Sequence, residues 1–320
     1  MDLIYTNADR VDQGVLADYA LDLSFGTDSS ENDFEMTLGK AGANLGAKSF
    51  IYMEGTEYGG VVDAIRTSTD SASVVYMGRT WHGILNTKVI EPDSGEDYLV
   101  VSGDANDILS TLINRLGLSG LFTAVKTSSG INFSGYQFPR YCKGYDGIRE
   151  MLEKKGAKLK IAWINRAVQL SAEPIVDYTA NAVDGDSAKI TIERHESKVN
   201  HLVCLGRGEL AKREVIHLYV DKFGNIGDTQ YFTGIEEVMD VYSNSNTDDL
   251  RSDGIARLKK LIDKDWAEMN SPESDRLAYD IGDIVGATDM QSQASFSSSV
   301  SQKIVRIKNG AIIIEYKMGS

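Results

Sequence analysis

The sequence predicts a mainly β protein of the α+β class, and three observations support this prediction. Apolar and polar residues alternate along 21–25 and 34–38, which is the period of two expected of strands. The 320 residues include 30 glycines and only 4 prolines, which suits a sheet with many glycine turns. Near its end the chain has two apolar segments joined by Asn309-Gly310, the dipeptide most typical of a two-residue hairpin.

Residues 1–101 are predicted to form an N-terminal antiparallel β-barrel domain. Short apolar segments separated by turn signals are expected to be strands at 21–25, 34–38, 50–53, 58–62, 74–77 and 80–85. Several short strands with regular turns between them are typical of barrels and sandwiches. His82 lies in the last of these segments, and with no partner motif nearby it is interpreted as a packed or exposed residue.

Residues 102–183 are predicted to form an α/β insert domain. Ser102-Gly103-Asp104 can cap a helix whose apolar residues recur at helical spacing up to Gly117. A second helix is expected over 145–155, before Gly156. The segments 158–163 and 167–170 then indicate a hairpin around Asn165-Arg166.

Residues 184–320 are predicted to form a second β-barrel domain with a helical insertion at about 234–275. Its first sheet strands are expected at 201–205, 215–220 and 228–232, with a bend at Gly206-Arg207-Gly208. The longest helix is expected over 247–269, where apolar residues line one face. Trp266 and Met269 lie on this face. A Trp on an amphipathic helix is usually core, but Trp also anchors many interfaces, and we predict that these two residues contact another subunit.

The C-terminal hairpin can be given a register from its turn. Asn309-Gly310 pairs Lys308 with Ala311, and counting outward puts Val305 opposite Ile314 and Lys303 opposite Tyr316. One face is then apolar and is predicted to be core: Val305, Ile307, Ile312, Ile314 and Tyr316. The other face places Ile304 and Ile313 among charged residues. We predict that these two contact another subunit, although single exposed apolar residues fit the pattern equally well.

Charge and cysteine content restrict the classes of function. The formal net charge is -14, which argues against a nucleic-acid-binding surface, since binding to phosphates requires a basic face. An acidic wall would instead let DNA pass without adhering. Cys142 and Cys204 give no disulfide framework and indicate folding in a reducing cytoplasm. No signal peptide is expected, and no apolar run approaches the ~18–20 residues of a membrane span.

No catalytic, cofactor or metal site is predicted. Gly206-x-Gly208 is too short for a dinucleotide fingerprint, and nucleophile elbows, His-Glu-x-x-His and phosphate loops are absent from the sequence. His201, Cys204 and His217 lack the fourth ligand of a closed zinc site. Cys142 with His201 as nucleophile and base is a weak hypothesis, because two lone residues make no motif.

Five segments resemble a known family. They are Asn32-Asp33-Phe34-Glu35, Gly55-Thr56-Glu57-Tyr58-Gly59-Gly60, Arg140-Tyr141, the stretch 200–226 and Gly234-x-Glu236-Glu237. Together they are similar to the siphovirus Gp37-like phage tail proteins, over nearly the whole chain. The resemblance implies a tail-hub or baseplate-hub protein with two tube-like β-barrel domains.

The resemblance also implies partners and location. Such hubs are expected to be homotrimers whose paired barrels form a pseudo-sixfold ring that lets DNA pass. One face would meet the tail tube or distal tail protein, and the other a spike or fibre protein. The protein would be made in the host bacterial cytoplasm and end in the virion tail, with no membrane insertion. A prophage tail and a tail-like bacteriocin are both compatible with the sequence.

Two other functions remain open at this point. One is a tail-associated cell-wall hydrolase or peptidase, although we expect no appended catalytic domain, because the sequence ends directly after the hairpin. The other is a receptor-binding tail module, which the aromatic residues Tyr136, Phe138, Tyr141 and Tyr145 would favour if they were exposed. Core or interface packing is the commoner use of such a cluster.

Overall fold

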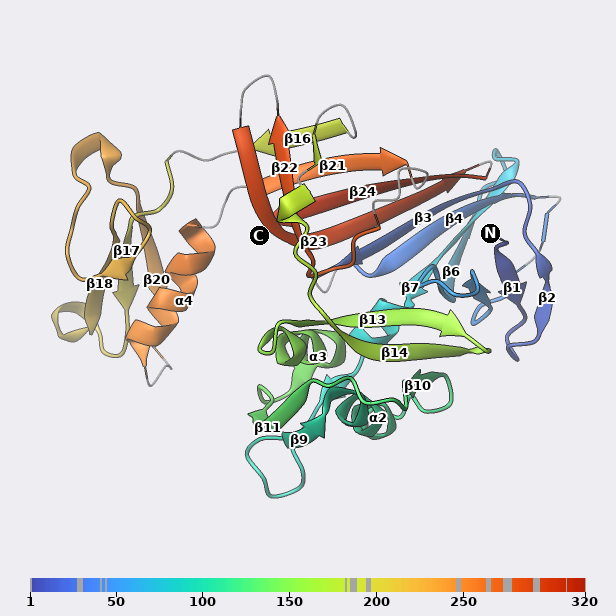
Figure 1. The fold of residues 1–320 in the computed structure, drawn as a ribbon, viewed down its shortest axis with the longest axis horizontal. Coiled ribbons are helices and arrows are strands. Elements are labelled where there is room, and N and C mark those ends of the chain that lie inside the picture. The colour runs from blue at the N-terminus through green and yellow to red at the C-terminus, as the bar shows by residue number, and fades with distance from the viewer. Residues whose placement is uncertain are drawn as a thin grey trace. The chain divides into compact units, whose positions relative to one another are not determined.

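The computed structural model describes residues 2–27, 31–40, 42–43, 45–181, 183–184, 189–193, 197–245, 249–262, 266–272, 278–289, 294–308 and 310–319. Contacts divide the chain into two compact units. The first unit contains Met1–Ile190 and Glu268–Met318, and the second contains Thr191–Ala267 with the last two residues. Figure 1 traces the chain through both.

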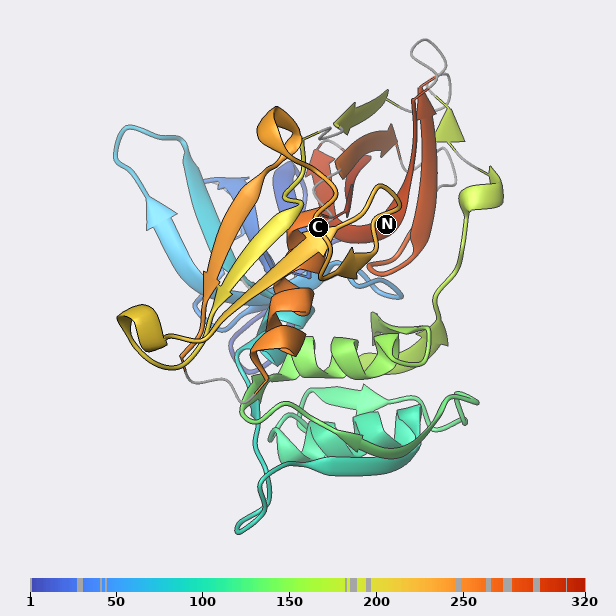
Figure 2. The ribbon, with the colours of Figure 1, turned by 90° about the vertical axis from the view of Figure 1, so that its left-hand side faces the viewer.

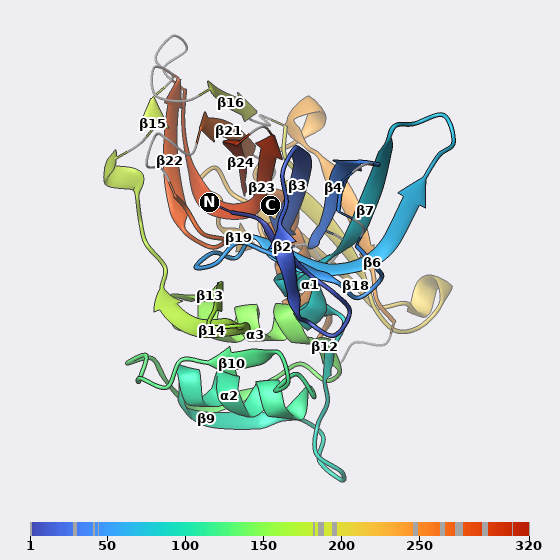
Figure 3. The ribbon, with the colours of Figure 1, turned by 90° about the vertical axis from the view of Figure 1, so that its right-hand side faces the viewer.

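The first unit is built on a long curled sheet (Figure 3). Its strand order is β16-β21-β24-β23-β3-β4-β7-β6-β5-β1-β2, with β22 on β23 and β15 on β22. The N-terminal strands are β1 (Ile4–Thr6), β2 (Asp12–Val15), β3 (Tyr19–Gly26), β4 (Asp33–Gly39), β5 (Phe50–Tyr52), β6 (Gly59–Thr67) and β7 (Ser73–Thr80). The later strands are β15 (Val183–Asp184), β16 (Lys189–Glu193), β21 (Trp266–Pro272), β22 (Ile284–Asp289), β23 (Ala294–Lys308) and β24 (Ala311–Gly319). The prediction of a mainly β fold is confirmed.

Alternation determines which face of this sheet is core. In β3 the side chains of Leu21, Leu23 and Phe25 are fully buried, whereas Asp22 between them is exposed. The register of β4 places Met36 opposite Leu21 and Glu35 opposite Asp22, so the two strands share a buried and an open face. The predicted strands at 21–25, 34–38, 50–53, 58–62 and 74–77 are therefore confirmed.

The strand predicted at 80–85 is wrong, because this segment forms helix α1 (Trp81–Asn86). Thr80 caps the helix, since its side-chain oxygen accepts a hydrogen bond from the Gly83 amide. At Gly83 the helix lies so close to the backbone of Asn32 that an added Cβ would be 2.1 Å from the Asn32 carbonyl oxygen. Tertiary contact through a glycine thus overrides the β-like composition of the segment.

The α/β part of the first unit follows the prediction closely. It contains β8 (Val89–Ile90), β9 (Val100–Asp104), α2 (Ala105–Arg115), β10 (Phe122–Ala124), β11 (Asn132–Gln137), β12 (Cys142–Lys143), α3 (Gly144–Glu153), β13 (Ala157–Ile164) and β14 (Ala167–Pro174). Both helices and the hairpin are confirmed. Asn165 and Arg166 have φ of 51° and 64°, the left-handed conformation that a tight hairpin turn requires. A short 3-10 turn, η1 (Thr179–Asn181), follows β14.

The second unit is a four-stranded sheet covered by one helix (Figure 2). It contains β17 (His201–Leu205), η2 (Leu210–Lys212), β18 (Val215–Val220), β19 (Ile226–Gly227), η3 (Gly234–Glu236), β20 (Met239–Ser243) and α4 (Leu250–Ile262). The strands pair in the order β19-β18-β17-β20. Leu202, Cys204 and Leu218 face α4 and share a core with its buried leucines. The strand predicted at 228–232 is wrong, because β19 ends at Gly227.

The long helix predicted over 247–269 is also wrong at its C-terminal end. Helix α4 ends at Ile262, and Trp266 and Met269 lie on strand β21, which pairs with β16 and β24. The i, i+3 spacing of Trp266 and Met269 fits a helix. These residues are in a strand because their segment pairs with strands that are distant in the sequence.

The C-terminal hairpin has the predicted register. Lys308 pairs with Ala311, Val305 with Ile314 and Lys303 with Tyr316. Strand β23 also pairs along β3, from Gln302 opposite Gly26 to Lys308 opposite Ala20. The N-terminal and C-terminal strands thus share one sheet, and residues 191–267 form the separate unit. This division differs from the predicted boundaries, which placed 201–220 with the C-terminal hairpin; the two-barrel division remains a prediction.

Candidate functional site, a buried ionic network

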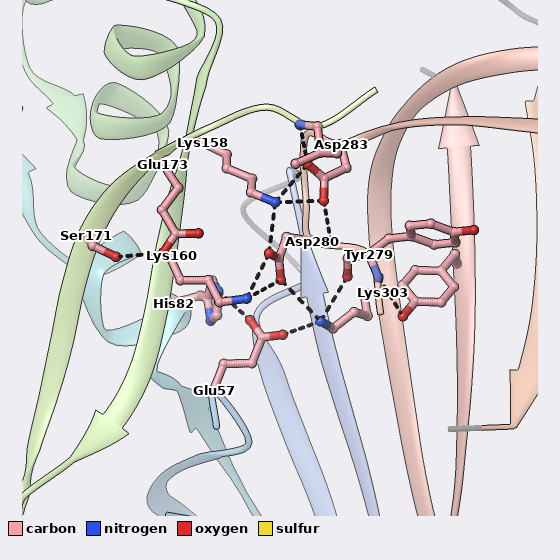
Figure 4. A network of polar contacts seen from close by, with 12 residues as sticks. Glu57, His82, Lys158, Lys160, Ser171, Glu173, Tyr279, Asp280, Asp283 and Lys303 are labelled. Atoms are coloured by element: carbon pink, nitrogen blue, oxygen red, sulfur yellow. Dashed lines mark hydrogen bonds and ion pairs between the residues drawn. The ribbon is translucent and has the colours of Figure 1, made fainter. Parts of the chain in front are cut away.

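A network of lysines and carboxylates lies inside the first unit (Figure 4). It joins three parts of the sequence: Glu57 and His82 from the N-terminal part, Lys158 and Lys160 on β13, and the C-terminal group of Asp280, Asp283 and Lys303. Figure 4 shows these side chains converging where β13, the segment before β22, and β23 approach one another.

Lys303 occupies the core face of β23 because strand alternation places it on the same side as Val305 and Ile307. Its side chain is only 6% exposed, and its ammonium group contacts the Glu57 carboxylate. It also donates a hydrogen bond to the Tyr279 carbonyl at 3.2 Å and lies 3.9 Å from Asp280. Burial by itself would lower the pKa of Lys303, but Glu57 together with Tyr58, Tyr316 and Asp280 outweighs burial, and the pKa is raised.

Glu57 is held in place by the turn between β5 and β6. Backbone hydrogen bonds from Gly55 to Trp163 and from Trp163 to Thr56 attach this turn to β13, at 2.8 and 2.7 Å. Burial would raise the pKa of Glu57, but Lys303 and then His82 hold it well below its ordinary value. Nε2 of His82 lies 3.3 Å from the carboxylate, and the ring of His82 is packed between Phe25 and Tyr145.

Lys158 joins the α/β part to the segment before β22. Its ammonium group donates to Asp283 at 2.7 Å and to Asp280 at 2.9 Å. Burial would lower the pKa of Lys158, but its hydrogen bonds to Asp283 and Asp280 raise it. Lys160 also donates to Asp280, at 2.8 Å.

Asp283 is completely buried and has its acceptor capacity occupied. Besides the two bonds from Lys158, it accepts from the amide of Val176 at 2.9 Å and from the amide of Asp280 at 2.9 Å. At Asp280, burial and the nearby Glu57 would raise the pKa, but Lys303 and Lys160 lower it. The four hydrogen bonds to Asp283 satisfy carboxylate oxygens that burial removes from water.

The chemistry of the network is that of a structural junction. Three lysines face three carboxylates, so the charges balance. The resolved pKa shifts move Glu57 and Asp280 downward and Lys158 and Lys303 upward, away from neutrality. A general acid or base needs a pKa near the working pH, which is the opposite arrangement. The network is therefore suited to hold three chain segments together.

The structure locates the four predicted interface residues on three strands. Met269 on β21 is fully buried within its own chain, and the side chain of Trp266 lies outside the described residues. Ile304 on β23 is partly buried and lines an open groove of about 410 Å³ with Asp22, Phe34 and Met77. Ile313 on β24 is 47% exposed and pairs with Arg306. Their role as interface residues remains a prediction.

The aromatic cluster considered for receptor binding is divided between core and surface. Phe138 and Tyr145 are buried, and Tyr136 packs edge-on against Phe138 with a centroid distance of 5.0 Å. Tyr141 is 57% exposed and lies beside the Arg140 guanidinium. The described part of the chain therefore exposes one large aromatic ring here rather than a cluster.

The residues considered as metal ligands, His201, Cys204 and His217, do not converge on one site. His201 and His217 lie on one face of the second sheet, whereas Cys204 points into the core under α4. Nδ1 of His201 is 2.6 Å from Glu237, and its Nε2 is 2.7 Å from Nδ1 of His217. Burial raises the pKa of the Cys142 thiol, which disfavours the nucleophilic thiolate. Within the described ranges, no three His, Cys, Asp or Glu side chains are arranged to hold a metal ion.

Sequence reasoning missed the ionic network. One signal was available, because the hairpin register already placed Lys303 on the apolar face opposite Tyr316, and a lysine on a core face requires a buried partner. Glu57 also lies within one of the segments that resemble the known family. Nothing in the spacing of Lys158, Asp280 and Asp283 indicates that they meet, because more than 100 residues separate Lys158 from either aspartate.

Three solved structures share this fold along almost their whole length. The tail protein from Neisseria meningitidis MC58 has a TM-score of 0.56 at 10% identity and covers 100% of this chain and 96% of its own. The 43 kDa tail protein of prophage MuSo2 from Shewanella oneidensis has a TM-score of 0.59 at 10% identity, with coverage of 99% and 97%. A chain of the p2 virion baseplate in its activated conformation has a TM-score of 0.51 at 10% identity, with coverage of 99% and 98%.

At these identities the likeness concerns the fold. No protein-family model matches the sequence, and no curated protein matches it. In addition, no helix within the described residues is long and apolar enough to cross a membrane.

Proposed function

We propose that this chain is a structural protein of a phage or phage-derived tail, located in the baseplate. The observation that carries the proposal is a fold shared end to end with tail and baseplate proteins, at TM-scores of 0.51 to 0.59. The ionic network supports a structural role, because its contacts join separate chain segments and the resolved pKa shifts of Glu57, Asp280, Lys158 and Lys303 are directed away from neutrality.

Within that role we assign the chain to the hub, as the resemblance to the siphovirus Gp37-like family implies. Three copies form a ring from paired barrel domains, with the tail tube or distal tail protein on one face and a spike or fibre on the other. DNA passes through without being gripped, in keeping with the net charge of -14. Ile304 and Ile313 supply apolar contacts between subunits, since each lies on the open face of the hairpin.

The experiment is light scattering combined with negative-stain electron microscopy of the purified chain, alone and mixed with a tube protein. A threefold particle with a central hole supports the hub. A monomer in both samples, with activity in a cell-wall hydrolysis assay, would overturn it in favour of a hydrolase.

A matched pair of variants tests the assigned interface. Ile313→Asp is expected to weaken ring formation while its melting temperature stays near that of the wild type. Ile65→Asp is the control, because Ile65 on β6 is exposed to a similar extent, 43% against 47%. An Ile313→Asp monomer that fails to fold would assign Ile313 to the core instead.

A further inference from the structure

A cavity with a basic lining lies in the first unit, away from the ionic network. Its volume is about 410 Å³. Four loops line it, namely the β1–β2 turn, the loop before β5, the loop after α1 and the loop after α2, together with residues of β5, β6, β7 and α1. Its charged lining residues are Arg10, Lys48, Arg79 and Lys88, and no acidic residue is among the described residues that line it. This composition is unexpected in a chain with 47 acidic and 33 basic residues. We call this cavity the basic pocket.

Only some of these cations are neutralised by the protein. Arg79 forms a two-point ion pair with Asp63, at 2.7 and 2.8 Å. Arg10 donates to the Gly120 carbonyl at 2.8 Å and lies over the Phe50 ring, 5.2 Å from its centroid. For Lys48 and Lys88, the described residues provide neither an ion pair nor a side-chain hydrogen bond. Lys48 and Lys88 therefore line the cavity with no counter-charge among the described residues.

The backbone is strained at two of these residues. Arg10 and Lys48 have φ of 65° and 69°, a conformation that glycine or asparagine adopts far more easily. The Arg10 turn is held by Asn7, whose side-chain oxygen accepts from the amides of Asp9 and Val11. Strained non-glycine residues cluster at binding sites, where the surrounding structure holds them. Both strained cations line the same cavity, which points to a function for this placement.

The pocket has the features of an oxyanion site with an apolar floor. Lysine and arginine donors bind carboxylates or phosphates through charge-assisted hydrogen bonds. Phe50 and Ile84, both nearly buried, form part of the wall and would contact the carbon atoms of a side chain. A cavity of this size admits one side chain with its backbone, and a chain of net charge -14 repels a duplex as a whole.

We propose that the basic pocket binds a glutamate or aspartate side chain presented by a neighbouring protein subunit of the tail. The carboxylate as ligand is inferred from the pocket residues alone, whereas the tail subunit as partner rests on the proposed function. Because the described residues provide no ion pair for Lys48 or Lys88, an incoming carboxylate would supply their counter-charge.

The test is calorimetric titration of the intact chain with a short blocked glutamate peptide and with its glutamine counterpart, at low and at high salt. We expect the glutamate peptide to bind, more weakly at high salt, and the glutamine peptide to give no heat. Lys48→Glu with Lys88→Glu is expected to weaken binding about tenfold or more, which corresponds to losing a charge-assisted contact.

The matched control is Lys126→Glu with Lys154→Glu, which makes the same change in charge at exposed lysines of the first unit outside the pocket. Both double variants must keep the wild-type melting temperature. Equal weakening by the two would overturn the proposal in favour of diffuse attraction. Two further titrations use inorganic phosphate and duplex DNA. Phosphate that binds as tightly as the glutamate peptide would overturn the proposal and indicate an adventitious ion only. Duplex DNA that binds more tightly than the peptide would overturn it in favour of a nucleic-acid ligand.

This titration is independent of ring formation. A chain that forms no ring but still binds the glutamate peptide would contradict the hub role and would not contradict the proposed binding site. A normal ring with no peptide binding would contradict the pocket alone.

Discussion

At the scale of single residues, the buried charges of the first unit depend on one another. Lys303 and Glu57 are 6% and 15% exposed, and each keeps the other ionised against the cost of burial. Removing one member of a buried pair leaves an uncompensated charge, whereas replacing both by apolar groups can be nearly neutral. The interaction therefore has to be measured as a pair.

We predict strong non-additivity in a double-mutant cycle at this pair. Lys303→Met and Glu57→Gln should each lower the free energy of unfolding by about 3–5 kcal/mol, because each leaves a buried charge without its main partner. Combining Lys303→Met with Glu57→Gln should cost less than the sum of the two, since no orphaned charge remains. Urea unfolding of the four proteins measures this, and additive losses would mean that the pair is solvated.

The pH dependence of this pair follows from the directions of its pKa shifts. Glu57 has a lowered pKa, so its contribution is present above the unfolded pKa and is lost only as the pH falls toward the folded value. Lys303 has a raised pKa, so its contribution is present below the unfolded pKa and is lost as the pH rises through the folded value. Between these limits the pair is insensitive to pH.

Asp104 gives a second prediction, in the acid range. It caps α2 and accepts hydrogen bonds from Asn106, Ser128, Ser129 and Gly130. Burial would raise its pKa, but these hydrogen bonds lower it to about 2. Its stabilisation is thus present above the unfolded pKa of about 4, and is lost as the pH falls through the folded pKa of about 2.

The measurement is the difference in unfolding free energy between the wild type and Asp104→Asn across that range. We expect the difference to shrink as the pH falls from about 4 to about 2. Asp107→Asn in the first turn of the same helix is the control for general helix electrostatics. A difference for Asp104→Asn that stays constant with pH would contradict the assignment.

At the scale of elements, helix α1 shows how a close contact determines secondary structure. All residues from Trp81 to Asn86 are buried, and Gly83 lies against the backbone of Asn32. The Thr80 cap and this contact together fix where the helix begins and which way it faces. His82 is thereby brought beside Glu57, so the element also positions one member of the ionic network.

Gly83→Ala is therefore predicted to destabilise the protein by about 1–3 kcal/mol, through overpacking. Alanine favours a helix over glycine by about 1 kcal/mol. Here, however, the new methyl group would be 2.1 Å from a backbone oxygen that cannot easily move. Thermal unfolding measures the effect. Gly39→Ala is the control, because its methyl group would meet nothing within 4 Å; equal melting temperatures for the two variants would refute the close contact.

At the scale of the whole molecule, the second unit is an insertion between two strands of the first. The chain leaves through β16 and returns through β21, and these strands are hydrogen-bonded neighbours. Neighbouring strands are about 4.8 Å apart, so a short linker can join them. The second unit has its own core, formed by α4 and the face of β17 and β18 that includes Leu202 and Leu218.

Replacing residues 197–262 with a short glycine-serine linker is predicted to leave the first unit folded, because insertions at such sites are commonly separable. The check is cooperative thermal unfolding, together with hydrogen exchange of the first-unit amides. A truncated chain that is soluble but lacks exchange protection in β3 and β23 would show that the first unit depends on the insertion.

The sequence by itself determined the local elements: the alternating strands of the N-terminal part, helices α2 and α3, and the C-terminal hairpin with its register. These depend on periodicity, caps and turn residues that lie within a few positions of one another, such as Asp104 before α2 and Asn309-Gly310. The placement of Lys303 on a core face also followed from the register alone.

Only the tertiary structure decided how these elements combine. Trp266 and Met269 lie on a strand rather than a helix because distant strands pair with them, and α1 is a helix because Gly83 fits against Asn32. Lys158 meets Asp280 and Asp283 only after the sheet has brought together segments more than 100 residues apart. The free energy that stabilises these contacts comes from burying apolar surface, and that burial depends on the whole chain. No local pattern of residues therefore encodes them.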